Sequence, residues 1–317
     1  MVNPLLGIKA MNQVNIINLL KWILTRVGIL YVAWFLLAPH IVDFTAISER
    51  IKVKRLNDTR PDFSALVTYH EEHSKLNMKD ADLYQRYFEM VVHYVGDDPI
   101  AEHALGFANL TINNNKKAVE ELEAVSARVP VLFWPDYNLG VYYYRQGQFN
   151  KAADHLNKAI NVPPNVVMKL MVDSIIYRQI LASKAFKSSL VMRIQQARMD
   201  ASVLLLAALE HIDADQAMMS MSLQIINDGS QSASPAVYYY AGLAAFKLKR
   251  YDKALVLFEK NIALDGKKPW SYLWLARLFD AAGDSEKAKE YLKAFSVLKE
   301  SQPQLLRYDQ EMDYKIF

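Results

Sequence analysis

Small and large apolar residues recur along this chain at a spacing of 34 residues. The recurrence is clearest in three series of positions: Gly106, Gly140, Gly242 and Ala276; Ala118, Ala152, Ala254 and Ala288; Leu122, Leu156, Phe258 and Leu292. Members of each series differ by 34 residues or by a multiple of 34. A period of this length indicates a repeated supersecondary unit rather than one globular domain.

One unit can be read in YNLGVYYYRQGQFNKAADHLNKAINVPP, residues 137–164. The pattern predicts two short amphipathic helices joined by a tight turn at Gly147. Gly140 and Ala152 are small enough to let the paired helices approach closely, and Leu156 fills the space between them. Because one such hairpin cannot bury its own apolar stripe, neighbouring units must stack.

The unit resembles the tetratricopeptide repeat (TPR), a helix–turn–helix family with this period. Four segments match its pattern: Glu102–Pro130, Tyr137–Pro164, Tyr238–Asp265 and Tyr272–Leu298. The resemblance implies an all-α fold, a right-handed TPR-type α-solenoid of stacked helical hairpins.

The phase of the repeat also divides the chain into segments. We expect an N-terminal segment at 1–44, a basic linker at 45–60, a capping helix pair at 61–98, two TPR units at 99–166, two more at 235–302 and a capping helix or solvated tail at 303–317. Residues 167–234 span two periods and have a helical pattern without the small-residue series. They are either two degenerate repeats or an insertion with long helices, and the preserved phase favours repeats.

The N-terminal segment contains the most apolar run of the chain. The 16 uncharged residues at 27–42 would span roughly 24 Å as a helix, slightly less than a bilayer core needs. Extending the helix back to residue 19 buries Arg26, which costs about 2.5–3.5 kcal/mol of insertion free energy. The eleven Leu, Ile, Val and Phe residues of the longer helix favour insertion by roughly 3–6 kcal/mol. We therefore predict a single membrane anchor at about residues 19–42, with Trp22, Arg26 and Trp34 as anchor residues.

A cleaved signal peptide and a buried soluble helix are the alternatives for this run. The 26 residues before it are many for a signal peptide, and FLLAPHIV has no small-x-small cleavage pattern. Basic residues flank both sides, and their count mildly favours a cytoplasmic repeat domain. The proximity of Lys21 and Arg26 to the run, together with the absence of cysteine, leads us to expect an extracytoplasmic repeat domain, periplasmic in a bacterium.

Composition narrows the function classes. The chain has no cysteine, so disulfides, thiolate metal sites and thiol catalysis are excluded. Residues 1–60 carry eight Lys or Arg against three acidic residues, so the other residues sum to −2 of the net charge of +3. The repeat region therefore lacks the basic excess that nucleic-acid binding requires, and the basic N-terminal segment suits anionic lipid.

Motifs for catalysis are weak in this sequence. No phosphate-binding glycine loop and no G-x-S-x-G nucleophile elbow is present. YHEEHS supplies His70, Glu72 and His73, but it is one residue short of H-E-x-x-H and lacks a further ligand, so a solvated helix face is the simpler interpretation. We predict no catalytic residue, metal, cofactor or small-molecule substrate, and a metal-dependent enzyme is the remote alternative.

The TPR resemblance also implies a binding surface, because the first helix of each unit lines a concave groove in that family. Carried over to this chain, the groove residues are Phe107, Trp134, Tyr137, Tyr144, Arg145, Tyr239, Phe246, Trp270 and Arg277. This surface lacks the Lys, Asn and Arg set with which some TPR domains hold a C-terminal carboxylate. We expect an apolar or aromatic protein segment as its ligand, unless these residues pack between units instead.

The sequence thus predicts a non-enzymatic, membrane-anchored TPR scaffold. It would bind a protein partner through the aromatic groove and help assemble or stabilise a membrane-associated complex. A chaperone-like assembly or quality-control adaptor for envelope proteins is the alternative.

Overall fold

The computed structural model describes residues 18, 21–22, 24–27, 78–96, 98–174, 190–228, 234–302 and 307–315. It divides into two units, Met1–Arg60 and Pro61–Phe317. In the first unit, the Arg26 guanidinium lies over the Trp22 ring, 5.1 Å from its centroid. No helix among the described residues combines the length and hydropathy needed to cross a bilayer, and residues 28–42 of the predicted anchor, including Trp34, lie outside them.

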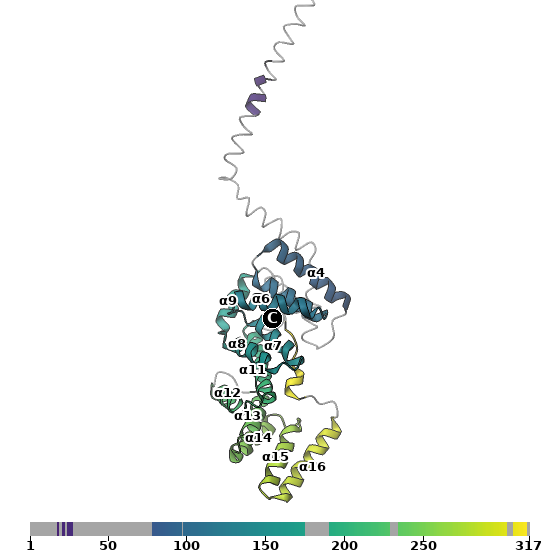
Figure 1. Cartoon of the computed structure of the whole chain (residues 1–317), viewed down its shortest axis with the longest axis vertical. Helices are drawn as coiled ribbons and strands as arrows, with labels where there is room; N and C mark the ends of the chain where they lie inside the picture. Colours follow the sequence, from purple (N-terminus) through teal and green to yellow (C-terminus); the bar gives the residue numbers. More distant parts are fainter. Residues whose placement is uncertain are drawn as a thin grey trace, which may run out of the picture. The chain divides into compact units, whose positions relative to one another are not determined.

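All described elements of the second unit are helical (Figure 1). They are α4 (Met78–Val95), α5 (Pro99–Thr111), α6 (Asn115–Arg128), α7 (Phe133–Arg145), α8 (Phe149–Asn161), α9 (Pro164–Asp173), α11 (Leu190–His211), α12 (Asp215–Asn227), α13 (Pro235–Lys247), α14 (Tyr251–Leu264), α15 (Trp270–Ala281), α16 (Ser285–Ser301) and the 3-10 turn η1 (Tyr308–Glu311). Consecutive helices pack as antiparallel hairpins, and each hairpin packs on the next. The expected all-α solenoid of helical hairpins is confirmed for these residues.

One turn geometry recurs in five hairpins: α5–α6, α7–α8, α11–α12, α13–α14 and α15–α16. In each, a residue with positive φ follows the first helix: Asn113, Gly147, Asp213, Lys249 and Gly283. At Gly147, the backbone N–H donates to the Tyr144 carbonyl at 3.0 Å, and the N–H of Gln148 donates to the Tyr143 carbonyl at 2.9 Å. This Schellman pattern satisfies the last carbonyls of the first helix and reverses the chain.

The hairpins interlock where a glycine of the first helix faces a large residue of the second. A Cβ at Gly140 would lie 2.5 Å from Leu156 Cγ, and one at Gly106 would lie 2.7 Å from Leu122 Cγ. Gly242 has the same relation to Phe258, at 2.7 Å. At these three positions of the series only glycine leaves room for the facing side chain, whereas the fourth position is Ala276.

Adjacent hairpins are joined by buried polar contacts. Between α6 and α7, the Ser126 hydroxyl contacts both carboxylate oxygens of Asp136 at 2.9 Å, and His155 Nδ1 of α8 lies 2.7 Å from the same carboxylate. Between α14 and α15, the Ser271 hydroxyl donates to Asn261 Oδ1 at 2.7 Å. These pairs occupy equivalent junctions, and because their side chains are buried they fix the register of one hairpin on the next.

The middle of the array is built around α11. This helix has 22 residues and packs against α8, α9 and α13, so it connects the two groups of predicted repeats. Its C-terminal part forms a hairpin with α12. At the other end of the array, α4 packs on α5, while residues 61–77 of the predicted cap lie outside the described residues.

We predict that Gly140→Ala lowers the free energy of unfolding by about 1–3 kcal/mol, because the new methyl group meets the fully buried Leu156. Denaturant unfolding of the wild type, of Gly140→Ala, of Leu156→Ala and of the double variant measures this. The double variant should lose clearly less than the sum of the two single losses, since truncating Leu156 makes room for the methyl group. Strict additivity of the two losses would contradict the interlock.

Candidate functional site

The predicted groove residues differ in their burial. Four are buried, three are partly exposed and two are exposed: Phe107, Trp134, Tyr137 and Tyr239; Tyr144, Phe246 and Trp270; Arg145 and Arg277. The Trp134 indole N–H lies 3.2 Å from Met171 Sδ of α9, so this side chain packs α7 against its neighbour. Phe107 is likewise fully buried within the array. Their role in partner binding stays a prediction.

Three of the predicted residues lie in the C-terminal hairpins and pair with their neighbours. The Phe246 ring lies 5.2 Å from the Trp274 ring, and the Arg277 guanidinium lies 4.5 Å above that same ring. The Lys299 ammonium lies 4.6 Å above the ring of Trp270. These contacts link α13 to α15 and α15 to α16.

The other predicted residues contact a segment of the chain itself. Residues 307–315, here named the strap, consist of η1 with its flanking residues and an extended stretch. Together they lie against α7, α11 and α13 (Figure 1). Tyr137, Tyr144 and Arg145 of α7 all donate hydrogen bonds to it. The strap therefore occupies part of the face that the TPR resemblance assigns to ligand binding.

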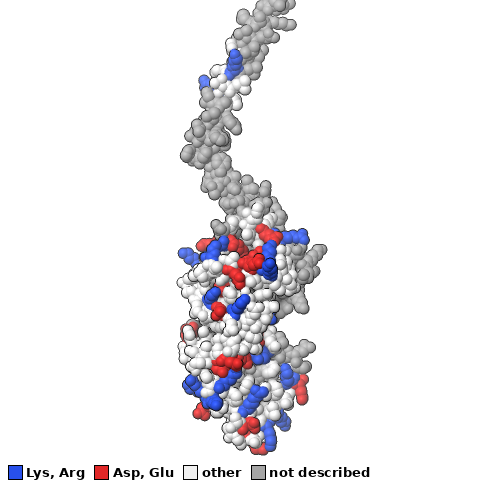
Figure 2. Space-filling model, in the orientation of Figure 1, with Lys and Arg blue, Asp and Glu red and all other residues white. Residues whose placement is uncertain are grey.

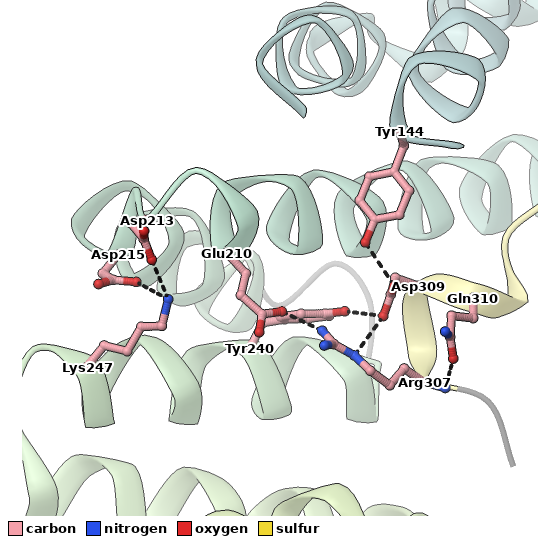
Figure 3. Close-up of polar contacts among 9 residues, drawn as sticks. All are labelled: Tyr144, Glu210, Asp213, Asp215, Tyr240, Lys247, Arg307, Asp309 and Gln310. Carbon is pink, nitrogen blue, oxygen red and sulfur yellow. Dashed lines mark hydrogen bonds and ion pairs between the residues drawn. The ribbon is translucent and has the colours of Figure 1, made fainter. Parts of the chain in front are cut away.

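The inner half of the strap, residues 307–311, is held by buried side chains (Figure 3). The Asp309 carboxylate accepts hydrogen bonds from the Tyr144 hydroxyl at 2.9 Å and the Tyr240 hydroxyl at 3.0 Å. Arg307 pairs with both Glu210 of α11 and Asp309. One acid thus joins α7, α13 and the strap, and the pairing with Arg307 compensates its removal from water.

Tyr308 of the inner half lies against α14 and the loop after it. Its hydroxyl accepts a hydrogen bond from Asn261 Nδ2 at 3.0 Å and donates to the Asp265 carboxylate at 3.2 Å. The Lys268 ammonium lies 4.5 Å above the Tyr308 ring and also pairs with Glu311. The inner half therefore contacts four helices and the loop before α15.

The outer half of the strap, residues 312–315, lies over α7. The Tyr137 hydroxyl donates to the Asp313 carbonyl at 3.0 Å. The Asn138 amide donates to the Lys315 carbonyl at 2.7 Å and accepts from the Lys315 N–H at 2.8 Å. Arg145 donates to the Met312 carbonyl at 3.1 Å and to the Asp313 carboxylate at 2.8 Å.

Burial and neighbouring acids perturb the tyrosines under the strap. Burial, followed by the charge of Asp309, raises the pKa of Tyr144 and of Tyr240 well above the usual value of 10. Burial likewise raises the pKa of Tyr137 and of Tyr308. Each hydroxyl therefore stays protonated and can donate to its oxygen partner on or beside the strap.

A pocket of about 460 Å³ lies beside the strap, between the α7–α8 turn, α11 and the strap. Three aromatic rings meet at it: Phe149 stacks on His211 with their centroids 4.0 Å apart, and Tyr144 contacts both rings edge-on. The remaining lining residues are Val141, Arg145, Gly147, Leu204, Asp309, Gln310 and Met312. The lining thus combines apolar and aromatic groups with polar and charged ones, which suits a side chain of a protein ligand.

Charge on this part of the molecule is mixed. Lys247 of α13 pairs with Asp213 at 3.0 Å and Asp215 at 3.3 Å, at the turn between α11 and α12 (Figure 3). Figure 2 shows basic and acidic side chains interspersed over the described surface that it displays. The described surface in this view therefore carries no broad field of one sign.

The metal hypothesis concerns residues that the structure does not describe, since His70, Glu72 and His73 lie outside the described ranges. Among the residues that are described, no group of three His, Asp or Glu side chains is placed to hold a metal ion.

Sequence reasoning did not anticipate the strap. It treated residues 303–317 as a cap or a tail because they show no 34-residue phase. The alternation of charged and aromatic residues in RYDQEMDYK was the available signal. Its complement, which includes Tyr240, Asn261 and Glu210, lies 47 to 97 residues away along the chain, and a repeat pattern gives no means of pairing them.

Comparison with known proteins was made at the level of family and fold. Residues 137–164 and 245–297 match models described as tetratricopeptide repeat. The chain contains tetratricopeptide repeats. No curated protein matches the sequence.

Several solved structures are similar to this chain at low sequence identity. PilF of Pseudomonas aeruginosa is 16% identical with a TM-score of 0.50, over 80% of this chain and 97% of that one. A crystal structure of MamA is 19% identical with a TM-score of 0.47, over 63% of this chain and 98% of that one. MamA from Desulfovibrio magneticus RS-1 is 16% identical with a TM-score of 0.47, over 65% and 98% of the two chains. At these identities the similarity concerns the fold alone.

We predict that the TPR array loses stability as pH rises above about 10, because the tyrosines under the strap ionise in the unfolded chain while their raised pKa keeps them protonated in the folded one. Their folded-state pKa exceeds the unfolded value, so their contribution is complete below the unfolded pKa and is lost above it. Urea unfolding at about pH 8 and about pH 11 measures the loss. The Tyr144→Phe variant should be less stable than the wild type at the lower pH, and its free energy of unfolding should fall less between the two pH values. An equal fall in the variant and the wild type would contradict the prediction.

Proposed function

We propose that this chain is a non-enzymatic TPR scaffold that binds a protein partner on the face formed by α7, α11 and α13. The observation that supports it best is the strap, because this face already holds an extended polypeptide through Tyr137, Asn138 and Arg145. The pocket beside the strap leaves room on the same face for a side chain of the partner.

The chemistry of the pocket favours binding over catalysis. The Asp309 carboxylate is occupied by two tyrosine hydroxyls and Arg307, and Arg145 is paired with Asp313. The His211 ring is stacked on Phe149. Rigid rings at a pocket are typical anchoring sites in protein recognition, since they bury a large area at low entropic cost.

A photo-reactive residue in place of Phe149 tests the proposal. With Phe149→benzoylphenylalanine in the native host, we expect a single dominant protein adduct upon irradiation, because the ring lines the pocket. The matched control is the same replacement at Val256, which is 63% exposed on α14. The adduct should be clearly stronger at position 149 than at position 256, because only position 149 lines the pocket.

The pattern of adducts separates the possible outcomes. One stoichiometric partner at position 149 supports the scaffold, while weak adducts with many envelope proteins would support the chaperone-like adaptor instead. The same adducts from both positions, or none at position 149, would refute the pocket as the partner's binding site.

We further propose that residues 19–42 anchor the scaffold in a membrane, with the repeats on the extracytoplasmic side and the bound partner part of a membrane-associated complex. The support is the uncharged run at 27–42 with Lys21 and Arg26 immediately before it. An anchored scaffold raises the effective concentration of its site for a partner in the same membrane.

Ser301→Cys tests this placement, because the chain has no cysteine and the side chain at 301 is exposed at the end of α16. In a bacterium with a permeabilised outer membrane, we expect a membrane-impermeant maleimide to label the variant while the inner membrane is intact. Fully lysed cells provide the accessibility control. Labelling only after lysis would place the repeats in the cytoplasm and overturn the proposed side.

A further inference from the structure

The two halves of the strap differ in how they are held. In the inner half, Tyr308 and Asp309 are 6% and 8% exposed, and their side chains carry hydrogen bonds to three helices and a loop, while Arg307 pairs with Glu210 of α11. In the outer half, all four residues are partly exposed. The inner half is therefore an integral part of the folded array, while the outer half rests on its surface.

The outer half is held largely through its main chain. The side chains of Tyr137, Asn138 and Arg145 together bond three carbonyls and one N–H of residues 312–315. Main-chain groups are the same in any polypeptide, so these contacts accept another extended segment as well as this one. Asn138 is fully buried while residues 312–315 are in place, and its amide bonds both the carbonyl and the N–H of Lys315.

The side chains of the outer half give the chemistry of such a segment. The Asp313 carboxylate pairs with Arg145 at 2.8 Å, and the same guanidinium lies 4.5 Å above the Tyr314 ring. The Lys315 ammonium pairs with Asp200 of α11. The order of recognised groups along the segment is therefore acidic, aromatic and basic.

We infer that residues 312–315 occupy the place of a partner segment, which displaces them and presents the same acidic–aromatic–basic order to Arg145 and Asp200. This inference rests on the proposed function in one respect, namely that the partner binds the face formed by α7, α11 and α13. The inner half stays bound during the exchange and keeps the pocket lining formed by Asp309 and Gln310 in place.

Tethering makes the outer half a competitor that a partner must overcome. A segment attached through a short linker acts at an effective concentration in the millimolar range, so an external peptide binds with a correspondingly reduced apparent affinity. Weakening the outer half without disturbing the inner half should therefore strengthen binding of an external segment.

The test uses the full chain and a labelled, end-capped peptide QEMDYK, the sequence of residues 310–315. In Asp313→Ala/Tyr314→Ala, we expect the peptide to bind at least about tenfold more tightly than to the wild type, because the tethered competitor is weakened. A full chain shortened to end at Met312 should behave in the same way, which guards against an effect peculiar to the substitutions. Arg145→Gln added to the double variant should remove the gain.

The control peptide QEMAAK should bind none of the proteins measurably. Equal binding of QEMDYK to the wild type and to both loosened variants, or equal binding of the two peptides, would overturn the inference. The photo-adduct at position 149 distinguishes this from failure of the proposed function. If an adduct forms at position 149 but the two peptides bind equally, only the displacement of residues 312–315 is refuted. If QEMDYK binds preferentially but no adduct forms, only the pocket is refuted as a partner site.

Discussion

The array depends on a steric constraint inside three of its hairpins, α5–α6, α7–α8 and α13–α14, namely the absence of a side chain where a large residue of the second helix packs. Leu122, Leu156 and Phe258 each occupy the volume that a Cβ at the facing glycine would need. Close approach of the two helices follows from this contact, and the stacking of hairpins follows from the apolar face that the close pair presents. The buried junctions at Asp136 and Asn261 then fix one hairpin on the next.

The repeats could be predicted from the sequence because their determinants are local. A glycine and its partner lie 16 residues apart in the same hairpin, and the pattern recurs with a fixed period. Residues 190–211 gave no such signal, since α11 is covered by α8, α9 and α13 and is apolar on more than one side. In the structure, its hairpin with α12 is recognisable from the turn, where Asp213 has a positive φ as Gly147 does.

The candidate site could be predicted only in part. The TPR resemblance predicted Tyr137, Tyr144 and Arg145, and these residues do lie on one face. It did not predict that the strap covers that face. Burial of Trp134 depends on Met171 of a helix outside the recognised units, so the sequence of the repeat alone could not reveal it. Position within a repeat tells which way a side chain points, whereas what covers it depends on segments that the repeat does not encode.

The strap also changes how the array holds together during unfolding. An open solenoid has contacts only between neighbours, so its terminal repeats fray independently of its centre. Here residues 137–145 are joined to residues 309–315 across more than 160 positions of sequence. Such closure couples distant hairpins into one cooperative unit, and its long-range contacts are the last to form when the chain folds, because they require the helices that they connect to be in place already.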